Sequence, residues 1–213
     1  MAKLLSQISV STTPPAVETN FNPQLLIPCE APYRDESRHH FPCINAIKAR
    51  HAAQDVRLFE EFAKAISTAQ QVLIIDKHLF SADGKNPDHS RRFKKVQDWF
   101  YTENIETVKI LTGHHDSQKE IEREFEKLTE LITESRGKVA PPITIKLSFS
   151  LGEVDYIHDR FAIIDNELWH FGATVGGFHR DVNAASRGWN AHSHNAVHFF
   201  DTAWTMANDR RRK

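Results

Sequence analysis

The sequence of 213 residues has few cysteines and no long apolar run. Its two cysteines, Cys29 and Cys43, belong to no metal-type cluster, and a chain of this length needs no disulfide, so we expect both to be reduced. The longest apolar stretch, around residues 72–75, suits a strand, whereas a membrane-spanning helix needs about 18 apolar residues or more. The first residues turn polar too soon for a secretory signal. These absences predict a cytoplasmic protein with no membrane span.

An excess of charge of one sign is also missing, because the formal net charge is −1. There is thus no overall electrostatic attraction to nucleic acid, and any such binding must come from a local patch. Hydrophobic residues make up 40% of the chain and charged residues 26%, which is ordinary for a folded protein with one core. Histidine is the compositional outlier, with 13 copies.

Proline is concentrated near the start of the chain, where it prevents any long helix. We therefore predict an irregular N-terminal extension over residues 1–45 and one folded domain over residues 46–213. The prolines that carry this prediction are Pro14, Pro15, Pro23, Pro28, Pro32 and Pro42.

The apolar periodicity of residues 46–213 alternates between that of helices and that of strands. It predicts helices over 47–68, 93–100, 117–132 and 203–208, and strands over 71–76, 108–112, 143–149, 161–164, 168–171 and 197–200. A loop is expected at 81–89, and the polar residues 165–167 are typical of a hairpin turn. Alternating strands and helices followed by several strands predict an α/β fold, with a mixed sheet flanked by helices.

The segment from residue 156 to residue 174 carries the most specific pattern. His158 and Arg160 are two residues apart, so on a strand both side chains project from the same face. An imidazole beside a guanidinium forms a reasonable anion site. Asp165 follows after four residues, and Gly172 after six more.

This spacing resembles the signature of the phospholipase D superfamily, H-x-K-x4-D followed after six residues by G-S and later by a strand similar to N-x-E-N-A-V. The matching residues here are His158, Arg160, Asp165, the pair Gly172-Ala173, and the run 192–197. Because the strands at 72–76 and 108–113 also look like the first strands of that fold, the resemblance covers approximately residues 71–205. It implies a phospholipase D-like mixed β-sheet flanked by helices.

The resemblance also implies a mechanism. Superfamily members attack phosphorus with the histidine, form a phosphohistidine, and protonate the leaving oxygen with a histidine from a second motif. No metal or other cofactor is needed. Only one motif is present here, so a homodimer is expected to bring two copies of His158 together, with Arg160 and Asp165 as the other catalytic residues. The expected activity is that of a metal-independent phosphodiesterase, more a nuclease than a lipase, acting on DNA or RNA.

Five residues are expected to bind substrate: Gly172, Thr174, His194, Asn195 and His114. His115 and the run 76–78 also follow predicted strands at what should be the same sheet edge, although both also have an ordinary interpretation as loop positions without function. The family's pattern is not complete, because Ala173 replaces serine, Val175 stands near an expected asparagine, and His194 replaces glutamate.

These departures support an alternative function. The chain would then be a catalytically degenerate module that binds nucleic acid or another phosphodiester as a subunit of a larger, defence-related assembly. A purely structural role also remains open, in which His158 is a strand-end residue, Asp165 a turn residue and Arg160 a solvated charge.

Two further groups have both a functional and an ordinary interpretation. Basic residues at 91–95 beside Trp99, and at 210–213, could contact a nucleic-acid backbone or be merely solvated. His192, His194 and His198 are evenly spaced, but no carboxylate or cysteine nearby completes a metal site.

Overall fold

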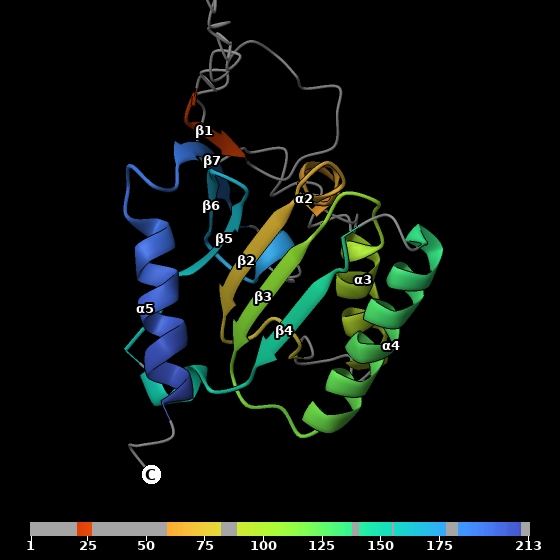
Figure 1. Cartoon of the computed structure of the whole chain (residues 1–213). Coiled ribbons are helices and arrows are strands. Elements are labelled where there is room, and N and C mark those ends of the chain that lie inside the picture. The colour runs from red at the N-terminus through yellow and green to blue at the C-terminus, as the bar shows by residue number, and fades with distance from the viewer. Residues whose placement is uncertain are drawn as a thin grey trace, which may run out of the picture.

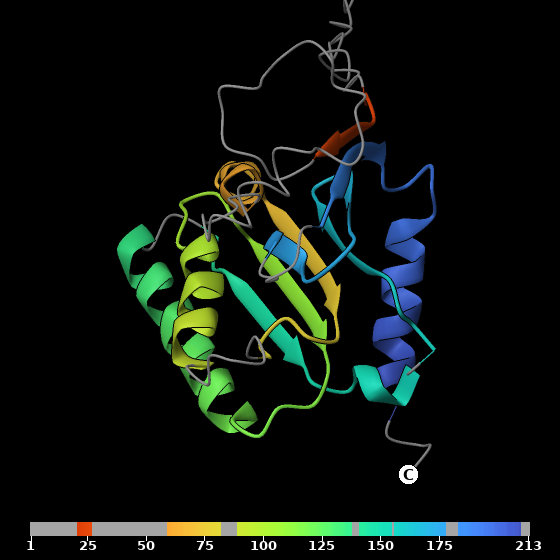
Figure 2. The same ribbon diagram turned by 180° about the vertical axis from the view of Figure 1, so that it is seen from behind.

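The computed structural model describes residues 21–26, 59–81, 89–137, 141–154, 156–177 and 183–209. They form a seven-stranded mixed sheet with the strand order β1-β7-β6-β5-β2-β3-β4. Figures 1 and 2 show the sheet between two layers of helices, with α2, α3 and α4 on one face and α5 on the other. The predicted α/β fold with a mixed sheet and flanking helices is therefore confirmed.

The elements follow one another along the chain in an order that alternates strand and helix up to β4. They are β1 (Gln24–Leu26), α2 (Phe59–Ile66), β2 (Gln71–Asp76), α3 (His89–Phe100), β3 (Thr107–Thr112), α4 (Gln118–Arg136), β4 (Thr144–Ser148), the short 3-10 helix η1 (Leu151–Val154), β5 (Arg160–Ile164), β6 (Glu167–Phe171), the 3-10 turn η2 (Val175–Gly177), β7 (Ala185–Asn190) and α5 (Ala196–Asn208).

Strand β2 is buried on both of its faces. Val72 and Ile74 belong to the core beneath α2, α3 and α4, whereas Leu73 and Ile75 belong to a second core beneath α5 and η1. Successive side chains of a strand point to opposite faces, so a continuous apolar run fits a strand buried on both sides. The run at 72–75 therefore forms a buried strand, as the sequence predicts.

The strand directions divide the functional candidates between the two ends of the sheet. Strands β2, β3 and β4 are mutually parallel, and β5, β6 and β7 each pair antiparallel to their neighbours in the order β2-β5-β6-β7. The carboxyl ends of β2, β3, β4 and β6 thus meet the amino ends of β5 and β7. We call this end the Asp76 edge, and the opposite end, at the β5–β6 turn, the Asp165 edge.

One predicted strand is wrong. Residues 197–200 form the first turn of α5 and not a strand. The buried residues of α5 are Ala196, Phe200, Ala203 and Ala207, at the spacing of three and four that defines one helix face. A four-residue window is too short to separate this period from that of a strand.

Within residues 46–213, the sequence pattern does not predict one of the strands. Strand β7 has only two buried residues, Ala185 and Gly188, and the sequence Ala-Ser-Arg-Gly-Trp-Asn lacks an apolar alternation. Its pairing with β6 is also irregular between Leu168 and His170. Because a bulge disrupts the two-residue period, the sequence pattern did not reveal this strand.

The sheet also extends into the predicted N-terminal extension. Strand β1 pairs antiparallel with β7, with Leu25 opposite Ser186. Gly188 has a φ of +93°, and a Cβ atom there would collide with the main-chain carbonyl of Asn22, so only glycine fits this close approach. Residues 24–26 are thus part of the sheet, and the predicted boundary at residue 45 does not separate them from it.

Other predictions fall outside the residues described above. These are the states of Cys29 and Cys43, the start of the predicted helix at 47–58, the loop at 82–88 and the basic tail at 210–213. Among the helices that the structure describes, none is both long enough and apolar enough to span a membrane.

Candidate functional site

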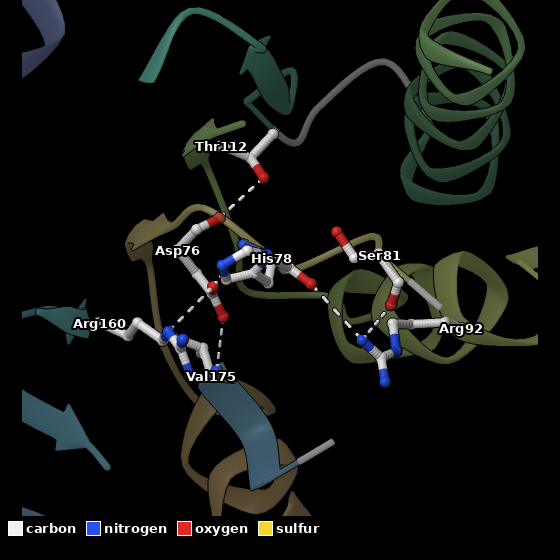
Figure 3. A network of polar contacts seen from close by, with 7 residues as sticks. All are labelled: Asp76, His78, Ser81, Arg92, Thr112, Arg160 and Val175. Carbon is white, nitrogen blue, oxygen red and sulfur yellow. Dashed lines mark hydrogen bonds and ion pairs between the residues drawn. The ribbon is translucent and has the colours of Figure 1, made fainter. Parts of the chain in front are cut away.

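The carboxylate of Asp76 is the centre of the polar network at the Asp76 edge. Asp76 ends β2, and its side chain is fully buried. Its two oxygens accept hydrogen bonds of 2.7 Å from the main-chain N–H groups of His78 and Val175, and Arg160 lies 3.8 Å away through Nε. Figure 3 shows these groups converging on the carboxylate from three segments of the chain. Asp76 therefore connects the end of β2, the start of β5 and the turn after β6.

Burial determines the protonation of Asp76. Loss of solvent raises the pKa of this carboxyl from 3.8 to about 6. The N–H groups of His78 and Val175 and the charges of Arg160 and Arg92 act in the opposite direction. At neutral pH the group is therefore ionised, and it forms an ion pair with the half-buried guanidinium of Arg160. A guanidinium has five N–H donors, so this single contact leaves donors for a phosphate.

His78 follows Asp76 by two residues, and nearby positive groups affect the pKa of its imidazole. Partial burial lowers the pKa of its imidazole, and the charges of Arg160, Lys77, His158 and Arg92 lower it further, in that order. Two of these groups reach the same network directly, since Arg160 lies against the Asp76 carboxylate and Arg92 donates to the His78 carbonyl. The Asp76 edge is consequently suited to an anion.

Arg92 fixes the main chain that carries His78. Its guanidinium is buried and donates to the carbonyl of His78 at 3.4 Å and to the carbonyl of Ser81. Figure 3 shows Arg92 and Asp76 on either side of His78. The sequence indicates Arg92 only as part of a basic surface cluster, whereas the structure places it in this network.

The structure brings together two of the three predicted catalytic residues. His158 is exposed in the segment before β5, and Arg160 is the first residue of β5. Both lie at the Asp76 edge. The imidazole is accessible to solvent while the guanidinium is held by Asp76, but only Arg160 belongs to the strand, so the predicted arrangement of both side chains on one strand face stays a prediction.

Asp165 does not join them. It lies at the other end of β5, about 17 Å away for five residues of strand, and it adopts a left-handed φ of 51°. Its Oδ1 accepts hydrogen bonds of 2.9 Å from the main-chain N–H groups of Gln70 and Gln71. The expectation that Asp165 shares a site with His158 and Arg160 is therefore not met, because its carboxylate fastens the β5–β6 turn to the start of β2.

Gly172 and Thr174 do reach the Asp76 edge. Gly172 donates to the carbonyl of Ala184 at 2.8 Å, and a Cβ there would lie 3.1 Å from the same oxygen, so glycine permits the close approach of the two segments. Thr174 is buried, as are Ala173 and Val175. This segment supplies the Val175 N–H to Asp76 and thereby shapes the floor of the site.

His194 and Asn195 lie elsewhere, so their predicted role in substrate binding at the site of His158 is wrong. They follow β7 at the Asp165 edge, where the N–H of Ala191 donates to Asn166 at 2.8 Å. His194 contacts the Asn190 carbonyl through Nδ1 at 2.9 Å, and Asn195, with a φ of 55°, precedes α5. Their predicted role assumed that residues 197–200 form a strand, whereas these residues begin α5.

The two histidines that follow β3 differ in exposure. The side chain of His114 is 80% exposed and lies 4.0 Å from Asp116, whereas His115 is buried and its Nδ1 accepts from the Ser117 N–H at 3.0 Å. Both belong to the Asp76 edge by their position after β3. His115 therefore supports the loop before α4, and His114 faces solvent at its rim.

No group of three or more metal-ligating side chains lies together within the described residues. A pocket of about 720 Å³ at the Asp165 edge is lined by Glu106, Asp165, Glu167 and Arg187, among others. Arg187 is engaged by Glu167 at 2.8 Å, so carboxylates dominate this pocket and it does not suit an anion. The Asp76 edge remains the better candidate for phosphate chemistry.

No protein-family model matches this chain, and no curated protein matches its sequence. One similar solved structure is that of TrmBL2, an archaeal chromatin protein described as showing a novel mode of DNA binding. The two are 11% identical with a TM-score of 0.37, and the match covers 70% of this chain and 48% of that one, so this chain spans about half its length. A likeness this weak supports no conclusion about function.

Proposed function

We propose that the protein is a metal-independent phosphodiesterase that cleaves nucleic acid through a phosphohistidine on His158. The observation that carries this proposal is the arrangement at the Asp76 edge, where an exposed imidazole precedes a guanidinium held by a buried carboxylate. An accessible nucleophile beside a fixed cation is what displacement at an anionic phosphorus requires.

The proposed first step forms a bond between a ring nitrogen of His158 and phosphorus and breaks the bond to the leaving oxygen. Arg160 stabilises the charge on the other phosphate oxygens, and Asp76 orients the guanidinium through the 3.8 Å contact. Water then attacks phosphorus and releases the imidazole. In the superfamily a second imidazole protonates the leaving oxygen, and the single motif of this chain predicts that a second copy in a homodimer supplies it.

An exposed aromatic ring favours nucleic acid as the substrate. Tyr156 is 71% exposed and lies two residues before His158. Bases stack on exposed aromatic side chains, and cations beside such rings bind the phosphate backbone. The arrangement thus offers a surface for a base next to the phosphate that would react.

The test is cleavage of single- and double-stranded DNA and RNA by the purified protein in EDTA. We expect cleavage to persist in the chelator and to fall by at least about a hundredfold in His158→Gln, because a nucleophile is lost. His198→Gln, on the exposed first turn of α5, is the matched control and should cleave normally. Activity that disappears in EDTA, or survives in His158→Gln, would refute the proposal.

A second candidate is a module that binds phosphodiesters without cleaving them, as a subunit of a larger assembly. It is favoured by the buried, apolar side chains of Ala173 and Val175, where the superfamily has polar contacts to phosphate. Binding that weakens with salt, with no turnover of any nucleic acid, would support this candidate over the enzyme.

A further inference from the structure

We propose that His78 is the second imidazole of the reaction, so that a single chain contains both His78 and His158 and needs no partner subunit to complete the site. This inference rests on the proposed phosphodiesterase function. It changes the expected origin of the proton donor from a second copy of the chain to the turn after β2.

The placement of His78 carries the inference. His78 follows β2, the strand that pairs directly with β5, and Ile75 lies opposite Phe161 one residue from Arg160. His158 and Arg160 both contribute to the electrostatic environment of its ring. Two segments separated by about eighty residues thus each bring a histidine to the end of the sheet where Arg160 lies.

The main chain of His78 is fixed while its ring lies at an accessible edge. Its N–H donates to Asp76 at 2.7 Å and its carbonyl accepts from Arg92 at 3.4 Å, and the residue as a whole is exposed. These two hydrogen bonds hold the turn without using the imidazole. A side chain presented on a fixed turn, at the same edge of the sheet as a proposed nucleophile, is suited to proton transfer.

In the proposed reaction the two imidazoles have complementary protonation states. Neutral His158 attacks phosphorus, and protonated His78 gives its proton to the leaving oxygen as the P–O bond breaks. In the second step neutral His78 takes a proton from water, the water oxygen bonds to phosphorus, and the P–N bond to His158 breaks. Both imidazoles return to their starting states.

A bound substrate provides a reason for His78 to become protonated. Partial burial and the surrounding cations lower the pKa of His78 in the free protein, whereas a phosphodiester anion held among the same cations contributes a negative charge that raises it. Substrate binding and protonation of His78 therefore favour each other.

The first experiment uses the dependence on the leaving group, which a merely structural role would not affect. His78→Gln is compared with the wild type on an oligonucleotide, whose leaving alkoxide needs a proton, and on bis(p-nitrophenyl) phosphate, whose phenolate does not. We expect about a hundredfold or greater loss with the oligonucleotide and a clearly smaller loss in the first-step burst of p-nitrophenolate. His198→Gln should match the wild type on both.

The second experiment asks whether one chain is sufficient. Wild-type protein is mixed in varying ratio with His158→Gln, under conditions that allow subunits to exchange. With both imidazoles in one chain, activity should follow the wild-type fraction linearly. With the site shared by two copies of His158, it should follow the square of that fraction.

The outcomes separate this inference from the proposed function. Cleavage that needs His158 but is unchanged in His78→Gln, an equal loss on both substrates, or a quadratic mixing curve would refute the inference and leave the phosphodiesterase intact. No cleavage by the wild type would refute both. A leaving-group-dependent loss together with linear mixing would establish the single-chain site.

Discussion

Asp76 is the residue on which the arrangement of the candidate site depends. Three segments meet at its buried carboxylate, and two of the three contacts are made by main-chain N–H groups that only an acceptor can satisfy. Its raised pKa means that folding favours the protonated form relative to the unfolded chain. The carboxyl therefore has a cost in stability that depends on pH.

The direction of that dependence follows from the two pKa values. Below pH 3.8 the carboxyl is protonated in both states, and between pH 3.8 and about 6 the unfolded chain ionises first. The contribution of Asp76 to stability is therefore greatest at low pH and is lost as the pH rises through about 6. A shift of this size corresponds to about 3 kcal/mol.

Between pH 4 and pH 7, we expect the wild type to lose about 3 kcal/mol of unfolding free energy relative to Asp76→Asn. The asparagine does not titrate, and the loss of one acceptor adds only a constant offset. Urea unfolding at several pH values measures the difference. A difference independent of pH would show that the pKa of Asp76 is not raised.

Asp165 illustrates what residue spacing leaves open. The spacing from Arg160 to Asp165 matches the superfamily signature, yet five residues of strand place the two at opposite ends of the sheet. The sequence predicted the turn at Asp165 correctly. It could not predict the partners of its carboxylate, Gln70 and Gln71, because those partners come from a different strand.

At the scale of elements, the sequence pattern predicts a strand at residues 197–200, where the structure has the start of α5. Its buried face includes Phe200, which stacks on Trp204 with ring centroids 5.9 Å apart, whereas Phe199 is 45% exposed. A strand would place Phe199 with Val197 on one face and Phe200 with His198 on the other. The exposure of these neighbouring phenylalanines therefore distinguishes the two interpretations.

Truncation of each ring tests the position of α5. Phe200→Ala should lower the unfolding free energy by about 3–5 kcal/mol, because it leaves a cavity beneath a fully buried ring. Phe199→Ala should cost about 1 kcal/mol, because that ring is partly exposed and contacts mainly Phe161. Chemical unfolding followed by tryptophan fluorescence measures both. Equal losses would contradict the helix as described.

At the scale of the whole molecule, the net charge of −1 and the cationic cluster at the Asp76 edge act in opposite ways. The whole chain does not attract a polyanion, whereas the accessible cations Lys77 and Arg160 lie at one edge, where Arg92 is buried beside the His78 carbonyl. Any attraction to nucleic acid should therefore be local, and few counterions should be released on binding.

The salt dependence of binding measures this. For His158→Gln, which should bind without cleaving, we expect log K to fall with log salt with a slope of roughly −1.4 on a single-stranded oligonucleotide, as for about two phosphate contacts made by Lys77 and Arg160. Fluorescence anisotropy over a salt series gives the slope. A slope several times steeper would indicate a large basic surface, and no salt dependence would mean that phosphate contacts do not drive binding.

The sequence by itself determined the class of fold and the closeness of His158 and Arg160 along the chain. The first follows from the period of the apolar residues, and the second is a matter of two residues of separation. Buried strands such as β2 and the hairpin at Asp165 were predictable for the same reason.

Only the tertiary structure decided which distant residues share the site. The pairing of β2 with β5 brings Asp76 and His78 to Arg160, and the turn after β6 adds the Val175 N–H, while the same topology carries Asp165, His194 and Asn195 to the opposite edge. The strand order and direction that produce this result depend on packing between segments far apart in the chain. A local sequence pattern can show that a strand is buried on one or both faces, but it does not show which other strand pairs with it or in which direction.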